Sequence, residues 1–168
     1  MEAFESTLWR PEMKRWIFFV LVVGSLLSLT ACKKQQNTEK ANPWVGAWKL
    51  DMSRSKLHEA PKQETMQIDT AGKDSLKYSI HGTSDEGKEY VENYDGKLDG
   101  NAYPVLVNGK ELGKIAFAWQ SERVYTAQGK GLGGSSLAET ATLSDDGKTI
   151  TIKSREGKEE EETAVYIK

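Results

Sequence analysis

The chain has 168 residues, and its 23 Lys and Arg side chains against 25 Asp and Glu give a formal net charge of −2. This near balance, with no basic run longer than two residues, argues against nucleic acid as a partner. One cysteine and two histidines exclude an internal disulfide and a cysteine-based zinc site, so we expect neither a metal nor another cofactor.

The first 31 residues have the layout of an export signal. A basic start at 13–15 precedes an apolar run over 16–29, which is too short to span a bilayer comfortably because a spanning helix needs about 20 residues. Residues 1–12 are acidic, which is unusual ahead of a basic signal start. We therefore assign residues 1–31 to a removable signal peptide, with Met13 as the expected start of translation.

The apolar run ends in Leu29-Thr30-Ala31-Cys32, which resembles the lipobox of bacterial lipoproteins. The resemblance implies that the signal is cut before Cys32, that its thiol carries a diacylglyceryl group and that its amino group is acylated. Two or three acyl chains anchor a protein stably in a membrane. Lys33 in place of Asp points, by the same resemblance, to the outer membrane, facing the periplasm. The alternatives are an ordinary secretory peptide and a short N-terminal anchor.

The remainder divides into a tether and one β domain. Residues 32–42 are polar and without period, which predicts a flexible tether; the lipoprotein resemblance implies that it carries the lipid on Cys32. Residues 43–168 consist of short alternating runs separated by turn dipeptides such as Asn108-Gly109, a strong hairpin signal. Strands are expected at 46–52, 62–70, 74–82, 88–95, 101–107, 113–120, 123–129, 135–144, 148–154 and 161–168.

Hydrophobic alternation indicates how these strands assemble. Leu76, Tyr78 and Ile80 share one face of their strand, with polar residues on the other face. A long sheet with one apolar face and short connections removes its edges by closing on itself. The sequence therefore predicts an all-β fold, an antiparallel up-and-down meander of about 8–10 strands closing into a barrel. A two-sheet β-sandwich is the alternative, and residues 53–58 could form a single helical turn.

Gly46 and Trp48 open the first strand in a pattern that resembles the Gly-x-Trp start of the calycins, the lipocalins and fatty-acid-binding proteins. Over residues 43–168 the resemblance implies a lipocalin-like barrel, with Trp48 plugging its closed end and a lipophilic small molecule as ligand. About a dozen residues follow the first strand, where fatty-acid-binding proteins insert two helices. The last strand has Tyr166 but lacks the Arg that holds a carboxylate in that family.

Lipocalins pack the first-strand Trp against a basic residue late in the chain. Three residues of this sequence could take that role by resemblance: Lys153, Arg155 and Lys168.

The predicted ligand-lining face comes from two neighbouring strands. Ile115, Phe117 and Trp119 alternate along one of them, and a two-residue turn at 121–122 would place Val124 opposite Trp119. We expect this apolar face to point into the barrel, where it lines a ligand cavity or forms a packed core.

Arg123 and Tyr125 form an Arg-x-Tyr pair that could hold a carboxylate. The same register places both on the opposite, outward face. The alternative, with Arg123 inward, would give the ligand site a polar half.

The sequence shows no catalytic constellation. The glycine-rich run 129–136 is followed by a strand and predicts a hairpin loop, the Glu run 159–162 predicts a solvated edge, and His58 and His81 lack metal-ligand spacing. We predict a non-enzymatic, lipid-anchored envelope protein whose barrel binds an apolar or amphipathic small molecule. The alternative is a structural lipoprotein with a packed barrel that docks an envelope protein.

Overall fold

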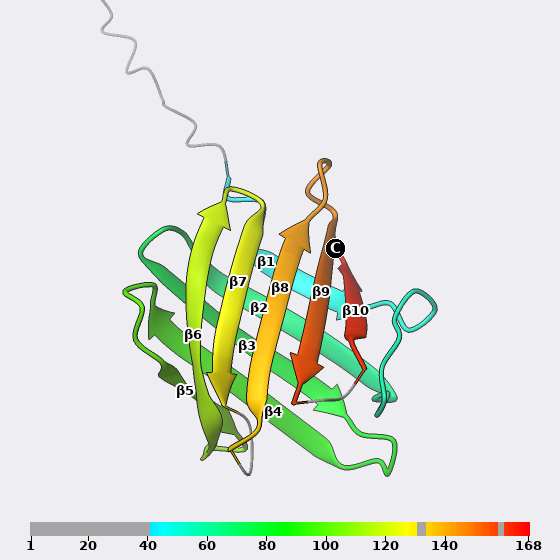
Figure 1. Ribbon diagram of the computed structural model, residues 1–168. Coiled ribbons are helices and arrows are strands. Elements are labelled where there is room, and N and C mark those ends of the chain that lie inside the picture. Colours follow the sequence, from blue (N-terminus) through cyan, green and yellow to red (C-terminus); the bar gives the residue numbers. More distant parts are fainter. Residues whose placement is uncertain (1–40, 131–133, 158–159) are drawn as a thin grey trace, which may run out of the picture. The chain divides into compact units, whose positions relative to one another are not determined.

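The computed structural model describes residues 41–130, 134–157 and 160–168. Within these residues ten antiparallel strands follow one another around a closed barrel, and the first pairs with the last (Figure 1). The up-and-down barrel is confirmed, and the two-sheet sandwich is wrong. The strands are β1 (Gly46–Leu50), β2 (Gln63–Ala71), β3 (Ser75–Thr83), β4 (Glu89–Lys97), β5 (Tyr103–Val107), β6 (Lys110–Ser121), β7 (Val124–Lys130), β8 (Ser136–Leu143), β9 (Thr149–Glu156) and β10 (Glu162–Ile167).

The signal predicted at 1–31, with its lipobox and Cys32, and nearly all of the tether 32–42 lie outside the described residues. These assignments stay predictions. In the part of the chain that is described, no helix has the length and hydropathy needed to cross a bilayer.

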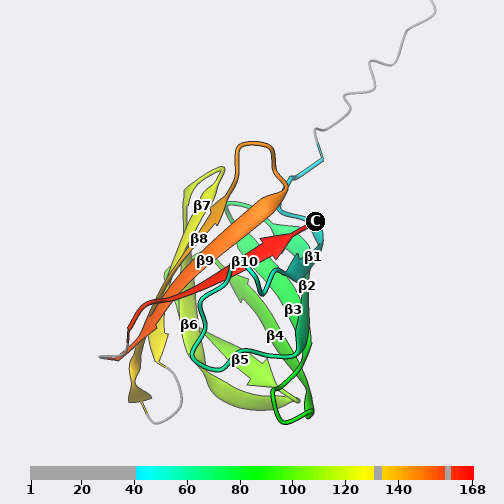
Figure 2. The same cartoon turned by 90° about the vertical axis from the view of Figure 1, so that its right-hand side faces the viewer.

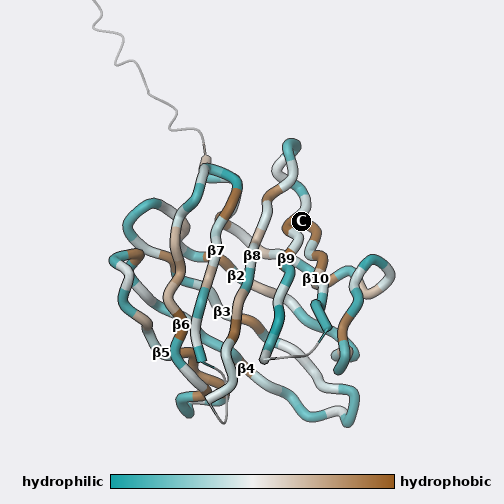
Figure 3. The backbone as a smooth tube through the Cα atoms, in the orientation of Figure 1, coloured by the Kyte–Doolittle hydropathy of each residue, from teal (hydrophilic) through white to brown (hydrophobic). Residues whose placement is uncertain are grey.

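Alternation and turn chemistry explain the strand boundaries. Figure 3 shows the hydropathy changing from residue to residue along the strands. The largest difference from the predicted bounds is the start of β6, which begins at Lys110 because Val107 pairs with Lys110 across a two-residue turn. Asn108 and Gly109 form this turn with φ of 49° and 77°, the left-handed conformation that an Asn-Gly hairpin favours.

The barrel has two different ends. The end that we call closed holds residues 41–45 and the turns that follow β2, β4, β6 and β8. The opposite end, the mouth, holds the connections that follow β1, β3, β5, β7 and β9. Figure 2 shows the connection from β1 to β2 passing beside β10, where Lys56 forms a β-bridge with Thr163.

This β1–β2 connection contains no helix. The helical turn expected at 53–58 is replaced by a tight turn in which Asp51 accepts hydrogen bonds from the backbone N–H and the hydroxyl of Ser53, at 3.0 and 2.6 Å. Local bonding of Asp to the backbone two residues on competes with helix formation. A short strap without a helix therefore lies at the mouth.

Trp48 is buried at the closed end, where the resemblance predicts a plug. Its side chain is 0% exposed, and its indole N–H donates to the backbone oxygen of Trp44 at 2.8 Å. The indole N–H of Trp44 in turn donates to the backbone oxygen of Glu122 in the β6–β7 turn, at 2.9 Å. Trp44 also meets Tyr125 edge to face, with the ring centres 5.0 Å apart.

A late basic residue covers this plug. The ammonium of Lys168 lies 4.6 Å from the centre of the Trp48 ring and donates to the backbone oxygen of Pro43 at 2.7 Å. Lys153, another of the expected candidates, instead pairs with Glu161 at 3.0 Å. Lys168 thus takes the position that the lipocalin resemblance assigned to a basic residue.

Candidate functional site

The barrel encloses a cavity of about 290 Å³. It runs from Trp44 at the closed end to Leu57 and Pro61 in the strap at the mouth. Its volume is at the lower limit of about 300–1,000 Å³ that is usual for small-molecule sites. Much of its wall is apolar, with the following side chains from six strands: Met66, Ile68, Leu76, Ile80, Phe117, Ala141, Ile150, Ile152 and Ala164.

Five glutamates line this cavity. Glu59 lies in the strap and Glu162 at the start of β10, and the other three lie within strands: Glu64 on β2, Glu92 on β4 and Glu139 on β8. Each of these three lies in the half of its strand that is nearer the mouth. Strand alternation turns them inward, because Glu64 is two residues from Met66 and Glu139 is two residues from Ala141, which also line the cavity. The apolar space thus meets a layer of carboxylates.

Tyrosine hydroxyls are bonded to two of these carboxylates. Tyr90 donates to one oxygen of Glu64 and Tyr166 donates to the other. Tyr78 donates to Glu92 with 3.1 Å between the oxygens. The three phenol protons are therefore already used within the protein.

Gly82 makes room for one of these bonds. In the sheet register Gly82 lies between Glu64 and Tyr90 on the neighbouring strands. A Cβ atom at Gly82 would collide with the ring of Tyr90. The missing side chain therefore lets the Tyr90 ring cross β3 and reach Glu64.

Glu139 differs from Glu64 and Glu92 because no described residue donates a hydrogen bond to it or forms an ion pair with it. Protein encloses Glu139 on nearly every side, and it keeps partial accessibility because it borders the cavity. Burial, with a smaller contribution from the charge of Glu92, raises the pKa of Glu139 to about 7. Burial also raises the pKa of Glu92, although its bond from Tyr78 opposes the shift.

The cavity meets a wider, acidic vestibule at the mouth. Glu139, Ser154 and Glu162 pair side by side on β8, β9 and β10, and they line the cavity and the vestibule alike. The vestibule has a volume of about 820 Å³. Its remaining wall consists of these side chains: His58, Glu59, Leu137, Glu156 and Glu160.

Only some of the predicted ligand-lining residues line the cavity. Phe117 and Tyr125 line the cavity. Ile115 is buried on the inner face and borders a separate side pocket of about 100 Å³. Trp119 packs edge to face on Tyr125, with the ring centres 5.0 Å apart, and it does not line the cavity.

The predicted register of β6 and β7 is wrong by one residue. The turn lies at 122–123, Ser121 pairs with Val124, and the register shifts between Trp119 and Ser121, so that Trp119 pairs with Tyr125. A one-residue shift turns every side chain of a strand to the other face. Tyr125 is therefore inside, 2% exposed, and Val124 is not part of the cavity wall.

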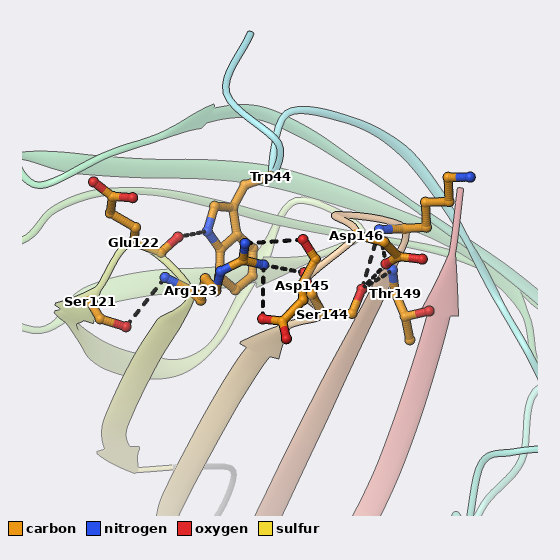
Figure 4. A network of polar contacts seen from close by, with 9 residues as sticks. Trp44, Ser121, Glu122, Arg123, Ser144, Asp145, Asp146 and Thr149 are labelled. Atoms are coloured by element: carbon orange, nitrogen blue, oxygen red, sulfur yellow. Dashed lines mark hydrogen bonds and ion pairs between the residues drawn. The ribbon is translucent and has the colours of Figure 1, made fainter. Parts of the chain in front are cut away.

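Arg123 does not reach the cavity. It is exposed in the β6–β7 turn, and its guanidinium donates to the backbone oxygens of Ser144 and Asp145 in the β8–β9 turn (Figure 4). The same figure shows the bond from Trp44 to the backbone of Glu122 close by. Arg123 thus joins two turns at the closed end, and the Arg-x-Tyr carboxylate site is wrong.

The sequence interpretation missed the carboxylate layer. Glu64, Glu92 and Glu139 were not considered as inner residues, although each is in phase with apolar neighbours on its predicted strand. This shared phase with inward-facing residues could have identified the three glutamates as inward-facing. In the described residues, no group of three or more His, Cys, Asp or Glu side chains is arranged to hold a metal ion.

Comparisons with known proteins find similar folds but no related sequence. No protein-family model matches the chain, and no curated protein does. Among solved structures, an Asn-to-Ala variant of the fluorescent protein UnaG has a TM-score of 0.53 at 13% identity, over 75% of this chain and 96% of that one. Apo lipid binding protein 8 of Caenorhabditis elegans has a TM-score of 0.51 at 10% identity, over 76% of this chain and 96% of that one.

At these identities the likeness shows the fold alone. The neighbours are calycin barrels of the fatty-acid-binding-protein type. The closed barrel that the resemblance implied is confirmed, and the match at Gly46 and Trp48 stays a resemblance.

Proposed function

We propose that this protein is a lipid-anchored envelope protein whose barrel binds an apolar or amphipathic small molecule. The supporting observation is the cavity of about 290 Å³, with an apolar wall from Trp44 to Phe117 and a polar layer nearer the mouth. A barrel that acts only as a scaffold gains stability from a filled interior. An internal space open at the mouth is what a ligand requires.

The fold neighbours add support, since one of them is named a lipid binding protein. The anchoring half of the proposal rests on the lipobox Leu29-Thr30-Ala31-Cys32. In the native host, Cys32→Ser is expected to abolish fatty-acid labelling and release the protein from the membrane fraction. A variant that is still labelled and membrane-bound would contradict the anchoring.

Binding is tested with N-phenyl-1-naphthylamine, a neutral fluorescent probe. We expect saturable binding with one probe molecule per chain and micromolar affinity, because each Å² of apolar surface removed from water contributes about 25 cal/mol before the costs of immobilisation. Ala141→Phe places a ring in the cavity and is expected to abolish binding.

Ala118→Phe is the matched control, since Ala118 is exposed on the outer face of β6. It is expected to bind the probe like the wild type. If the folded wild-type protein shows no saturable binding, or if both variants bind equally, the cavity is not a ligand site. The packed-scaffold function would then replace the proposal.

A further inference from the structure

The cavity wall offers hydrogen-bond acceptors and few donors. Besides the three phenols bonded to glutamates, Tyr125 donates to the backbone oxygen of Gly72 at 3.1 Å and Trp44 donates to the backbone oxygen of Glu122. Among the described lining residues, the hydroxyl of Ser154 is the donor that has no assigned acceptor. A ligand group that needs donors from the protein finds almost none here.

Negative charge is not balanced inside the barrel. Neither Lys nor Arg is present in the described wall of the cavity. Lys114 and Lys130 border the small side pocket together with Glu92 and Glu139, but both lysines are exposed and neither is within 4.0 Å of those carboxylates. Lys114 pairs instead with Glu111, at 3.9 Å.

Among the described residues Glu139 is the inward-facing carboxylate that lacks a partner, whereas Glu59, which also has none, is exposed in the strap. A carboxylate removed from water without a hydrogen bond or counter-charge is unfavourable by several kcal/mol, and the neighbouring Glu92 adds repulsion. Its free oxygens border the cavity at the point where the apolar wall ends and the acidic vestibule begins. The partner that this position requires is a hydrogen-bond donor with a positive charge.

We propose that the ligand is an amphiphile with a protonated amine, whose apolar part fills the cavity while its ammonium group binds Glu139. This inference rests on the proposed ligand-binding function. An ammonium donates up to three hydrogen bonds and accepts none. It therefore matches a wall that offers carboxylate acceptors and whose tyrosine hydroxyls already donate to protein groups. A fatty-acid carboxylate would meet the opposite arrangement, with Glu64, Glu92 and Glu139 repelling it.

The test uses three eight-carbon probes that differ in the head group: octylamine, 1-octanol and octanoate. Each competes with N-phenyl-1-naphthylamine for the full chain at about pH 8, where Glu139 is mostly ionised and the amine is protonated. We expect octylamine to displace the probe at a concentration lower by about tenfold than 1-octanol. Octanoate is expected to need a higher concentration than 1-octanol.

Glu139→Gln should then remove the preference for the amine. The affinity for octylamine is expected to fall by about fivefold or more, while that for 1-octanol is unchanged. Glu122→Gln is the matched control, because it removes the same charge from an exposed position at the closed end. It should leave all three affinities unchanged.

A pH series with the wild type keeps the inference testable if Glu139→Gln does not fold. The amine preference should decrease from pH 8 to about pH 5.5 as the carboxyl group is protonated. The groups that face Glu139 from the surrounding elements, and that titrate or carry charge, are Tyr78 (β3), Glu92 (β4), Lys114 (β6), Lys130 (β7), Glu156 (β9), Glu162 (β10) and, from the strap and the β9–β10 connection, His58, Glu59 and Glu160.

The outcomes separate the two proposals. If 1-octanol displaces the probe as well as octylamine does, or if octanoate is the strongest competitor, the amine inference is overturned and the binding function stands. A preference that survives in a folded Glu139→Gln protein also overturns it. If the probe itself does not bind, the proposed function fails.

Discussion

The closed end and the carboxylate layer use the same kinds of side chain in opposite ways. At the closed end, the donors of Trp44, Trp48 and Tyr125 all bond to backbone oxygens, and those of Trp44 and Tyr125 join segments distant in sequence. In the carboxylate layer, Tyr78 and Tyr166 donate to glutamates that line a cavity. One region completes the backbone's hydrogen bonding, and the other brings charge into the barrel.

This difference indicates where the barrel gains stability and where it gives some up. Trp48 buries a large apolar surface with its one polar atom satisfied, which is the most favourable use of an indole. Glu139 is enclosed without a partner, which favours the unfolded chain at neutral pH. Conversely, a group that is unfavourable in the free protein is the one that a ligand can satisfy.

The largest effect is expected at the plug. Trp48→Ala should lower the free energy of unfolding by about 3–5 kcal/mol, because it removes a fully buried indole and leaves a void. Urea unfolding followed by far-UV circular dichroism measures this. Trp119→Ala, at a partly exposed site, is expected to be milder. A loss below about 1 kcal/mol for Trp48→Ala would contradict a major contribution of Trp48 to the free energy of unfolding.

A somewhat smaller effect of opposite sign is expected in the carboxylate layer. Because the pKa of Glu139 is raised from 4.5 to about 7 in the folded state, the unfolded chain releases this proton first as the pH rises. The contribution of Glu139 to stability is therefore fully present below about pH 4.5 and is lost as the pH rises to about 7, by roughly 3 kcal/mol for this shift.

Glu139→Gln should remove that decrease and make the protein more stable than the wild type at pH 8. Thermal unfolding of both proteins between pH 5 and pH 8 measures the difference. The exposed control Glu122→Gln should follow the wild-type curve. Parallel curves for Glu139→Gln and the wild type would show that Glu139 does not titrate in this range.

The smallest effect is expected for Lys168, which lies over the ring of Trp48. Lys168→Gln removes the cation above the Trp48 ring and weakens the bond to the Pro43 oxygen. A cation–π contact at an exposed site contributes about 0.5–1 kcal/mol, so a modest fall in the melting temperature is expected. Lys148→Gln, near the same end, serves as the control. Equal melting temperatures for Lys168→Gln and the wild type would contradict a stabilising role of this contact.

Local patterns were enough to predict the strands and the closure of the barrel. Asn108-Gly109 carries its own turn geometry, and the alternation over Leu76, Tyr78 and Ile80 holds in the cavity wall. These features depend on residues that are close together in the sequence, so they can be recognised from a single sequence.

The register of β7 was not predictable in the same way. The irregularity between Trp119 and Ser121 inserts one residue into β6, and no residue type there requires it. That single residue decides whether Tyr125 or Val124 is inside. The inward glutamates were missed for another reason: charged residues are generally expected to face solvent, and only the barrel brings Glu64, Glu92 and Glu139 around one space.

The point at which the chain joins the barrel has a mechanical consequence. Residues 41–45 lead into β1 at the closed end. β1 is short, held to β10 by two residue pairs and to β2 by four, with Lys168 and Pro43 adding a clasp. A force applied through the N-terminal residues therefore loads β1 and the plug first. Attachment through the N-terminal residues, to a lipid or to a solid support, would hold the barrel by its closed end. The connections at the mouth would then bear no force directly.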